Sequence, residues 1–540
     1  MKIINGIGAS DYVALEKMYF IETVDYEVLP KEGFDPKVEL DHFKSVQKQA
    51  LDELEILYQQ TLKKNKTSAE IFKVHQMMLE DYDYVESVEA LILKTYSASY
   101  AVYETGKKLK AFFESLDNEI LNERAFDVVD VSRRMLRIFK GIKDNKELPK
   151  GKFILVSEDL YPSDIVKFEY SQIAGFVTKY GSRNGHAAIL ARTLNIPIVV
   201  NLGDKFELLP EEGILAINGL TGEVILNPNN YVTDIYKEKL KEQEEQVKML
   251  LKYKDLKAIS PKGKHIEVAV NIGSLNDLEL VKKSGADGVG LFRSEFIYLE
   301  SKKYPTEEEQ FLIYKEVLSK LEGKKVIIRT LDIGADKKVD YFNLPKEDNP
   351  ALGFRAVRIC LKRPEIFKAQ LRALIRASAY GKLAIMVPMI TDLCQVLESK
   401  KMIKEIMEEL KKENIPYDEN LFFGIMIETP AAAIISDVLA KHVDFFSIGT
   451  NDLTQYTIAV DRTNAEVEEL FDYSHEAIKR LVKLIADNAH KENIWVGICG
   501  ESASELSLID YYLEVGIDEL SVSPGKVSKV KKAIIESKNG

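Results

Sequence analysis

The chain has 540 residues and a formal net charge of −12 at pH 7, from 74 Lys and Arg residues against 86 Asp and Glu residues. One hydrophobic core does not support a chain of this length, so we expect two or three domains. The excess of acidic residues argues against a protein that binds nucleic acid through general attraction to phosphates.

The cysteine content and the N-terminus indicate a cellular compartment. Cys360, Cys394 and Cys499 are too few and too scattered for a disulfide framework or a Cys-based zinc site, which fits a reducing environment. The N-terminus lacks the apolar core of a signal peptide, and no run of eighteen apolar residues occurs. We therefore expect a cytoplasmic protein without a membrane span.

The first half of the chain combines strand patterns with a long helical region. Residues 1–25 are typical of short strands and loops. From 35 to 143, Gly and Pro are nearly absent, and apolar residues such as Leu51, Leu54 and Tyr58 recur at helical spacing. This pattern predicts a bundle of roughly four helices, with Gly106 as an interruption or an end.

The residues after the helical region return to a strand pattern. Apolar runs near 153–157, 175–178, 198–200 and 214–226 predict a compact α/β unit. The helical bundle is thus predicted to be inserted into this unit, between its first strand and the rest. Residues 231–257, between Pro228 and Pro261, are highly charged and indicate a solvated linker helix.

Strand and helix patterns alternate from residue 261 to the end of the chain. Each of eight candidate strands is followed by a helical pattern. The strands lie near 267–272, 288–292, 325–329, 384–389, 421–427, 443–448, 495–498 and 519–522. Eight such units in about 280 residues predict a TIM barrel.

Several of these strands end in a side chain suited to chemistry on a small anion. Arg293, Arg329, Glu428, Asp452 and Cys499 each follow an apolar run. Because the carboxyl ends of the strands meet at one face of a parallel barrel, we expect these groups to converge where barrel enzymes keep their active sites.

The basic residues predict an anion pocket. Arg293, Arg329 and Arg462, with Lys337 and Arg355, form a candidate cationic cluster. The planar fork of arginine matches carboxylate and phosphate oxygens in pairs, so the cluster suits a ligand that carries both groups. Taken singly, each arginine is more often part of a surface ion pair.

The acidic residues and the thiol complete this candidate site. Glu428 and Asp452 follow successive strands, and two carboxylates are the usual protein contribution to a Mg²⁺ site that the substrate completes. Cys499 is either a small core residue or a proton donor to a developing carbanion or enolate.

His186 is the candidate outside the barrel. It follows a glycine-bearing turn and precedes a helical pattern, so a phosphorylated imidazole would face free backbone N–H groups. The alternative is an ordinary histidine in a turn. No phosphate loop of the Gly-x-x-x-x-Gly-Lys-Ser/Thr type and no dinucleotide fingerprint after a strand occurs, so nothing favours nucleotide binding.

The chain resembles enzyme I of the bacterial phosphotransferase system, the phosphoenolpyruvate-protein phosphotransferase family, over essentially its whole length. The motifs that carry the resemblance are Asp287-Gly-Val-Gly-Leu-Phe-Arg293-Ser-Glu-Phe, Arg329-Thr-Leu-Asp-Ile-Gly, Asn349-Pro-Ala-Leu-Gly-Phe-Arg355, Glu428-Thr-Pro-Ala-Ala-Ala and Asp444-Phe-Phe-Ser-Ile-Gly-Thr-Asn451-Asp452 through Arg462.

The resemblance implies a role for most of the candidate residues. Arg293, Arg329 and Arg462 would hold phosphoenolpyruvate together with Asn451 and Asp452. In the same way, Lys337 and Arg355 would belong to the substrate pocket.

The resemblance also implies the chemistry. Glu428 and Asp452 would bind Mg²⁺, His186 would attack the phosphorus, and Cys499 would protonate the enolate to release pyruvate. The phosphoryl group would then pass to a histidine of a small HPr-like carrier protein. Because His186 lies outside the barrel, it would swing between two sites, with hinges near 145–150 and 228–260.

The implied organisation is a multidomain α/β protein. Residues 1–30 and 145–228 would form a swivelling phosphohistidine domain, and 31–144 the inserted bundle that docks the carrier. Residues 229–260 would be a linker, and 261–540 the barrel, through which the family forms a homodimer. The expected function is the first step of the sugar phosphotransferase system.

One feature leaves other functions open, and one alternative is excluded. The family usually has Gly-Gly-x-Thr-Ser-His, whereas this chain reads Gly181-Ser182-Arg183-Asn184-Gly185-His186. A paralogue that serves a regulatory phosphorelay, or a non-catalytic phosphoenolpyruvate-binding regulator, would fit this change. A dikinase or synthase that uses phosphoenolpyruvate would need a further nucleotide-binding domain, for which the chain has no room.

Overall fold

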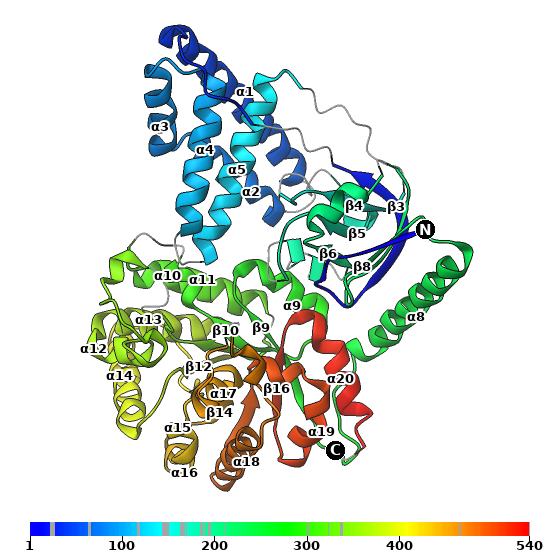
Figure 1. Cartoon of the computed structure of the whole chain (residues 1–540). Coiled ribbons are helices and arrows are strands. Elements are labelled where there is room, and N and C mark those ends of the chain that lie inside the picture. The colour runs from blue at the N-terminus through cyan, green and yellow to red at the C-terminus, as the bar shows by residue number, and fades with distance from the viewer. Residues whose placement is uncertain are drawn as a thin grey trace. The chain divides into compact units, whose positions relative to one another are not determined.

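The computed structural model divides the chain into two compact units, Met1–Gln246 and Val247–Gly540, which are drawn together in Figure 1. It describes residues 1–538 except for 22–26, 63–65, 116–118, 143–150, 162–167, 169, 184–186, 189–190, 193–195, 211, 300, 302, 322, 335–338, 463 and 465.

The first unit is built on an eight-stranded mixed sheet with the strand order β1-β8-β7-β3-β4-β5-β6-β2. Strands β3, β4, β5 and β6 run parallel, and the outer pairs are antiparallel. The strands are β1 (Lys2–Asn5), β2 (Ile7–Gly8), β3 (Val13–Phe20), β4 (Phe153–Ser157), β5 (Ile173–Thr178), β6 (Ile198–Val200), β7 (Ile214–Asn218) and β8 (Glu223–Leu226). The predicted α/β unit is confirmed.

Helices α1 to α5 come between β3 and β4 in the sequence, although these two strands pair side by side, with Met18 opposite Ile154. The helices are α1 (Pro36–Leu62), α2 (Lys66–Leu79), α3 (Tyr82–Leu93), α4 (Ala98–Ser115) and α5 (Glu119–Phe139). The described residues thus form five helices rather than roughly four. Asp81 makes the difference, because its side chain accepts the N–H groups of Asp83 and Tyr84 and starts a new helix.

Gly106 lies inside α4, so the prediction that it interrupts or ends a helix is wrong. A Cβ atom at this position would lie 2.5 Å from Ser132 Oγ on α5. The glycine therefore allows a close approach of two neighbouring helices and does not end one.

The predicted linker helix is observed as α8 (Asn230–Lys254). Near its start, Tyr236 packs against Ala216 and Ile225 of the sheet. Near its end, the buried Lys531 donates hydrogen bonds to the carbonyl groups of Lys254, Leu256 and Gly285 at 3.1, 2.9 and 2.7 Å. A cation at this end satisfies carbonyl groups that a helix leaves without partners.

The second unit is a closed barrel in which every neighbouring pair of strands is parallel. The strands are β9 (Glu267–Ile272), β10 (Val289–Arg293), β11 (Val326–Arg329), β12 (Leu383–Val387), β13 (Phe422–Ile427), β14 (Phe445–Ile448), β15 (Trp495–Ile498) and β16 (Glu519–Val522). They match the eight predicted strands, so the TIM barrel is confirmed.

Helices surround the barrel, as Figure 1 shows. They are α9 (Leu278–Ser284), α10 (Glu295–Leu299), α11 (Glu307–Lys320), α12 (Val357–Lys362), α13 (Pro364–Ala377), α14 (Leu393–Lys412), α15 (Pro430–Ile434), α16 (Ser436–Leu439), α17 (Thr450–Ile458), α18 (Glu476–Lys491), α19 (Leu506–Glu514) and α20 (Val527–Ile535).

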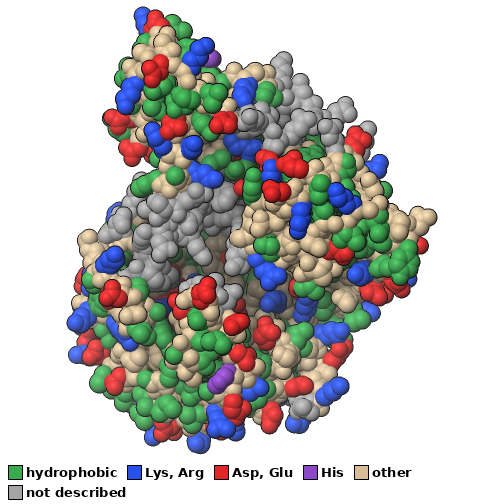
Figure 2. Space-filling view, in the orientation of Figure 1, with side chains coloured by type: hydrophobic (Ala, Val, Ile, Leu, Met, Phe, Trp, Pro, Cys, Tyr) green, Lys and Arg blue, Asp and Glu red, His purple; other side chains and the backbone are tan. Residues whose placement is uncertain are grey.

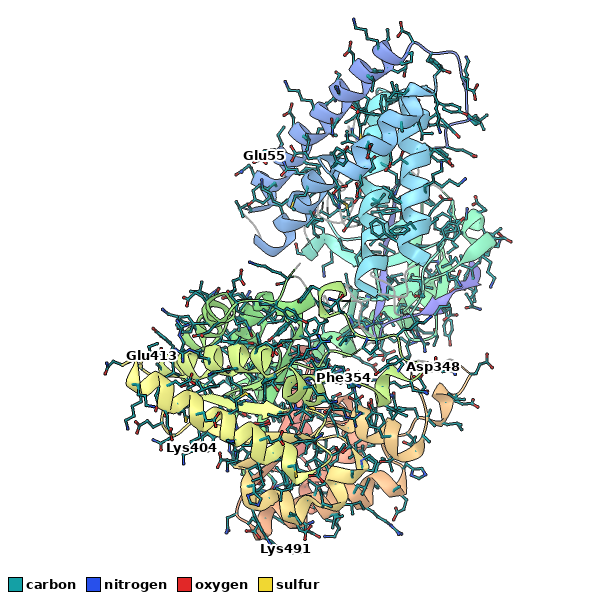
Figure 3. All side chains as sticks on the ribbon, turned by 90° about the vertical axis from the view of Figure 1, so that its left-hand side faces the viewer. Glu55, Asp348, Phe354, Lys404, Glu413 and Lys491 are labelled. Atoms are coloured by element: carbon teal, nitrogen blue, oxygen red, sulfur yellow. The ribbon has the colours of Figure 1, made fainter. Side chains whose placement is uncertain are left out.

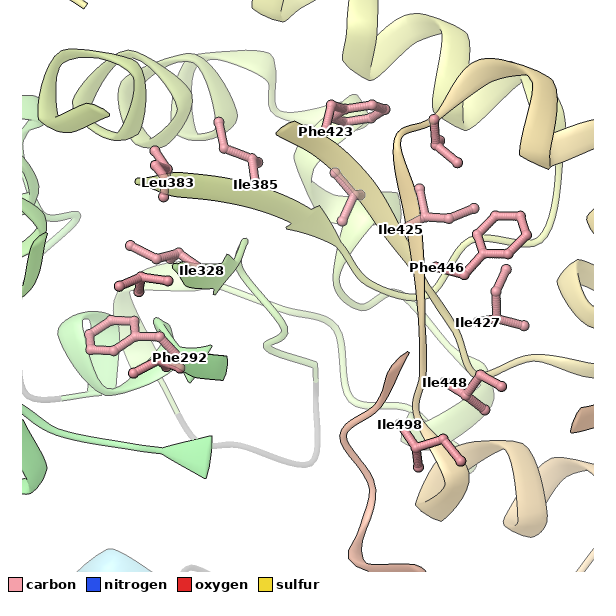
Figure 4. Packing of buried hydrophobic residues seen from close by; sticks show 14 of the residues in the cluster. Phe292, Ile328, Leu383, Ile385, Phe423, Ile425, Ile427, Phe446, Ile448 and Ile498 are labelled. Atoms are coloured by element: carbon pink, nitrogen blue, oxygen red, sulfur yellow. The ribbon is translucent and has the colours of Figure 1, made fainter. Parts of the chain in front are cut away.

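Side chains alternate between the two faces of the barrel wall and form two separate cores. Residues such as Ile328, Ile425 and Phe446 belong to the large core that also contains helix residues (Figure 4). A smaller cluster, which includes Ile327 and Met426, fills the interior. Successive side chains of a strand point to opposite faces, so residues two apart face the same way. A residue two positions after Ile327 or Met426 therefore also faces the interior, at the carboxyl end of the barrel.

The surface carries charges of both signs. On the face drawn in Figure 2, Lys and Arg side chains are interspersed with Asp and Glu. Arg372 on α13 pairs with Glu409 near the end of α14 and with Glu413 just beyond it. Figure 3 labels Glu413 there and Lys404 along α14. Among the described residues, no helix has the length and apolar character needed to cross a membrane.

We predict that Lys531→Met lowers the free energy of unfolding of the barrel unit by about 3 kcal/mol, because three carbonyl groups lose their charged donor. Urea unfolding followed by the fluorescence of Trp495, the single tryptophan, measures this unit. Lys529→Met is the control, since Lys529 is an exposed lysine on the same helix. Equal midpoints for the two variants would contradict the anchoring role.

Candidate active site at the carboxyl end of the barrel

Arg329, the last residue of β11, is a buried cation held by two carboxylates. Its guanidinium pairs with Glu295 at the start of α10 and with Asp332, at 3.0 Å between Nη1 and Oδ2. Burial alone disfavours the charge, but the neighbouring carboxylates outweigh it and raise the pKa of Arg329 above its ordinary value. The guanidinium is therefore permanently charged.

Arg355, which precedes α12, is a second buried cation. Its Nη2 lies 2.8 Å from Asp332 Oδ1 and 3.8 Å from Asp452 Oδ2, and its Nη1 donates to the Tyr456 hydroxyl at 3.2 Å. Asp332 thus bridges Arg329 and Arg355 with its two oxygens. Through Asp332, the end of β11 and the segment before α12 are joined in one charged cluster.

Glu428 directly follows β13 and is almost fully buried. Its Oε1 accepts the Met389 N–H at 2.6 Å. A Cβ atom on Gly449 would lie 2.9 Å from Oε2, so the absent side chain leaves space beside that oxygen. Burial and the nearby Asp452 carboxylate raise the pKa of Glu428 to about 8, against the opposing effect of Arg329.

Glu428 and Asp452 have the ligand chemistry that Mg²⁺ prefers. Both offer carboxylate oxygens, and their mutual repulsion would be relieved by a cation between them. Among the described residues, no group of three or more His, Cys, Asp and Glu side chains could hold a metal.

Asn451 and Asp452 lie in the first turn of α17, immediately beyond β14. Asn451 Oδ1 accepts hydrogen bonds from the Tyr473 hydroxyl at 3.0 Å and from the Glu501 N–H at 2.9 Å. Arg462, which follows α17, is exposed, and its Nη2 lies 3.9 Å from Asp452 Oδ1.

Cys499 directly follows β15 and is buried, with its Sγ 3.7 Å from the Ile448 carbonyl oxygen. Asn271 Nδ2 donates to its carbonyl group at 3.0 Å. The next residue must be glycine, because a Cβ atom on Gly500 would lie 2.0 Å from Thr450 Oγ1. Burial raises the pKa of the Cys499 thiol to about 11.

The structure brings most of the predicted site residues to one end of the barrel. Arg329, Arg355, Asp452 and Arg462 are linked by charge contacts. Arg293, at the exposed end of β10, pairs in register with Arg329. Glu428, Asn451 and Cys499 follow β13, β14 and β15 in barrel order. His186 and Lys337 lie outside the described residues, so their predicted roles stay predictions.

Other polar residues in this cluster were not predicted from the sequence. They are Glu295, Asp332, Tyr456, Tyr473 and Glu501. Glu295 and Asp332 had a readable signal, because each follows a strand-end arginine within three residues and carries the opposite charge. No sequence signal pointed to Tyr456, Tyr473 or Glu501, since only the fold brings their partners close.

The assembled site can bind a small polyanion and protonate carbon. Arg329 and Arg355 are held in place by carboxylates, which preorganises their N–H donors before a ligand arrives. The buried thiol keeps its proton at neutral pH and can act as a general acid.

Three family sequence models match the chain. They describe the PEP-binding domain of PEP-utilising enzymes at residues 247–539, the N-terminal region of these enzymes at 5–124, and their mobile domain at 149–222.

Named relatives cover nearly the whole chain. The phosphoenolpyruvate-protein phosphotransferase of Priestia megaterium is 40% identical over 99% of this chain and 94% of its own. That of Bacillus subtilis (strain 168) is 40% identical over 99% of this chain and 96% of its own. A solved structure titled as an NMR structure of Enzyme I (nEIt) is 30% identical over 45% of this chain and 99% of its own, with a TM-score of 0.40.

We predict that Cys499 remains a thiol across the neutral range and ionises only as the pH approaches 11. Thiolate absorbance in the ultraviolet, recorded as the difference between the native chain and Cys499→Ser, measures this. Because the pKa is raised, the proton is held below that pH and lost above it. A difference signal that rises near pH 8 would contradict the buried, protonated thiol.

Proposed function

The chain belongs to the phosphoenolpyruvate-protein phosphotransferase family, the enzymes that begin the phosphotransferase system. From this family membership we propose how its residues perform the transfer. In this proposal the phosphoryl group of phosphoenolpyruvate passes to His186 and then to a histidine of a small HPr-like carrier protein. The charge network at the barrel mouth is the observation that carries the proposal.

The proposed division of labour assigns one step to each part of the chain. Residues 261–540 bind phosphoenolpyruvate, and residues 1–30 with 145–228 carry the phosphohistidine. Residues 31–144 dock the carrier, and 229–260 link the parts. The matches to the family's mobile domain and PEP-binding domain, at 149–222 and 247–539, support this division.

In the donor site, the cations recognise the two anionic ends of phosphoenolpyruvate. Arg293, Arg329 and Arg462 offer paired donors to phosphate and carboxylate oxygens, together with the Asn451 amide. We assign Arg355 and Lys337 to the same pocket. Asp332 and Glu295 hold the two buried guanidinium groups in place before the substrate arrives.

The transfer step forms one bond and breaks one. An imidazole nitrogen of His186 bonds to phosphorus, and the bond between phosphorus and the enol oxygen breaks, leaving the enolate of pyruvate. The Cys499 thiol then gives its proton to the methylene carbon, and the thiolate recovers a proton from solvent. Arginine donors offset the negative charge on the transferring oxygens.

We propose that Glu428 and Asp452 hold Mg²⁺ when substrate is present. The ion would supply positive charge next to the phosphate oxygens, and the two carboxylates fit it as described above. We also propose that the protein is cytoplasmic and forms a homodimer through the barrel.

We expect the full-length chain to acquire an acid-labile label from phosphorus-labelled phosphoenolpyruvate in Mg²⁺. His186→Ala removes the accepting nitrogen and abolishes the label, and a chelator lowers the labelling rate. His42→Ala, which removes an exposed histidine of α1, is the matched control and keeps the label. A native chain that binds phosphoenolpyruvate but takes no label would instead indicate a regulator, for which the Asn184-Gly185 change beside His186 is the motivation.

We expect Cys499→Ala to slow pyruvate release about 100-fold, because a positioned general acid typically contributes at least this factor. The phosphoenolpyruvate concentration that half-saturates the reaction should stay near the native value. Reduction of the released pyruvate to lactate measures the rate, and Cys394→Ala, an exposed cysteine on α14, is the control. Unchanged pyruvate release in Cys499→Ala would rule out the proton-donor role.

A further inference from the structure

Asn451 is the one uncharged side chain assigned to phosphoenolpyruvate, and both of its polar atoms already have neighbours in the structure. Its Oδ1 accepts from the Glu501 N–H at 2.9 Å and from the Tyr473 hydroxyl at 3.0 Å. Its Nδ2 lies 3.4 Å from Glu501 Oε1. An amide oxygen has two lone pairs, so these two donors saturate it.

This pattern determines which way the amide faces. A backbone N–H can only donate, so the atom opposite the Glu501 N–H must be the amide oxygen. If the amide were flipped, its NH₂ group would face that N–H donor to donor. The orientation therefore leaves Nδ2, with two N–H groups and one long contact, as the atom available to a ligand.

Tyr473 is placed for this bond by a hydrogen-bonded turn. Asp472 accepts hydrogen bonds from the Ser474 N–H and hydroxyl, both at 2.7 Å. His475 then caps α18 by accepting the Ala477 N–H at 3.2 Å. The half-buried Tyr473 ring packs against the barrel core. Burial and the nearby Glu501 carboxylate raise the pKa of Tyr473, so its hydroxyl stays a donor.

We infer that Tyr473 and Glu501 are positioning residues that hold the Asn451 amide with its N–H groups toward the substrate. An amide held this way can only donate to the ligand, so it favours an acceptor-only group, such as a phosphate or carboxylate oxygen, over a hydroxyl that must donate. Neither residue needs to touch the substrate. The inference rests on the proposed binding of phosphoenolpyruvate at Asn451.

Tyr473→Phe tests the inference, because it removes the hydroxyl and keeps the ring. The rate at which the full-length chain acquires label is measured over a range of phosphoenolpyruvate concentrations in Mg²⁺. We expect the half-saturating concentration to rise about fivefold, the effect of one hydrogen bond, while the maximal rate changes less than twofold. Tyr511→Phe is the control, since its hydroxyl bonds the Lys479 carbonyl group elsewhere on the barrel.

A double-mutant comparison separates positioning from a general structural effect. Adding Tyr473→Phe to Asn451→Ala should cause no further rise in the half-saturating concentration, because the amide it orients is gone. An equal rise in both backgrounds, or a native value for Tyr473→Phe alone, would overturn the inference. If the native chain takes no label at all, the proposed function fails instead, so the two failures are distinguishable.

Discussion

Asp332 shares its carboxylate between two buried arginines, and the barrel mouth depends on this sharing. A buried charge is tolerated only with a partner, and removing one partner of such a pair typically costs about 3–5 kcal/mol. Here Arg329 and Arg355 each reach a second carboxylate as well, Glu295 and Asp452 respectively. The network therefore stabilises a set of cations that still has N–H donors to offer an incoming anion.

At the opposite, amino end of the barrel, charged side chains also pair with one another. Lys325 lies 2.5 Å from Glu267 Oε2, 2.9 Å from Glu519 Oε2 and 3.9 Å from the centre of the Trp495 ring. The Trp495 ring stacks on Phe445 in the interior layer. At this amino end one lysine contacts two carboxylates, whereas the carboxyl end combines the buried Arg329 and Arg355 with the Cys499 thiol. This asymmetry is what barrel enzymes generally display.

Much of the fold could be predicted because it follows from local pattern. The eight barrel strands were readable as apolar runs, and the placement of Arg329 and Glu428 followed from their positions at the ends of those runs. The prediction of the helical bundle failed where a single residue decides where a helix begins or how closely two helices pack. Asp81 starts a fifth helix, and Gly106 serves helix packing, and neither effect has a periodic signature.

The family, the barrel and the side chains with the right chemistry can be recognised from the amino-acid sequence, because motifs and alternation are properties of neighbouring residues. How those side chains are held depends on the folded chain. Tyr473 meets Asn451 across 22 positions, and Glu501 meets it across 50. Arg355 meets Tyr456 across 101 positions. Contacts over such separations arise from barrel closure and leave no local pattern to read.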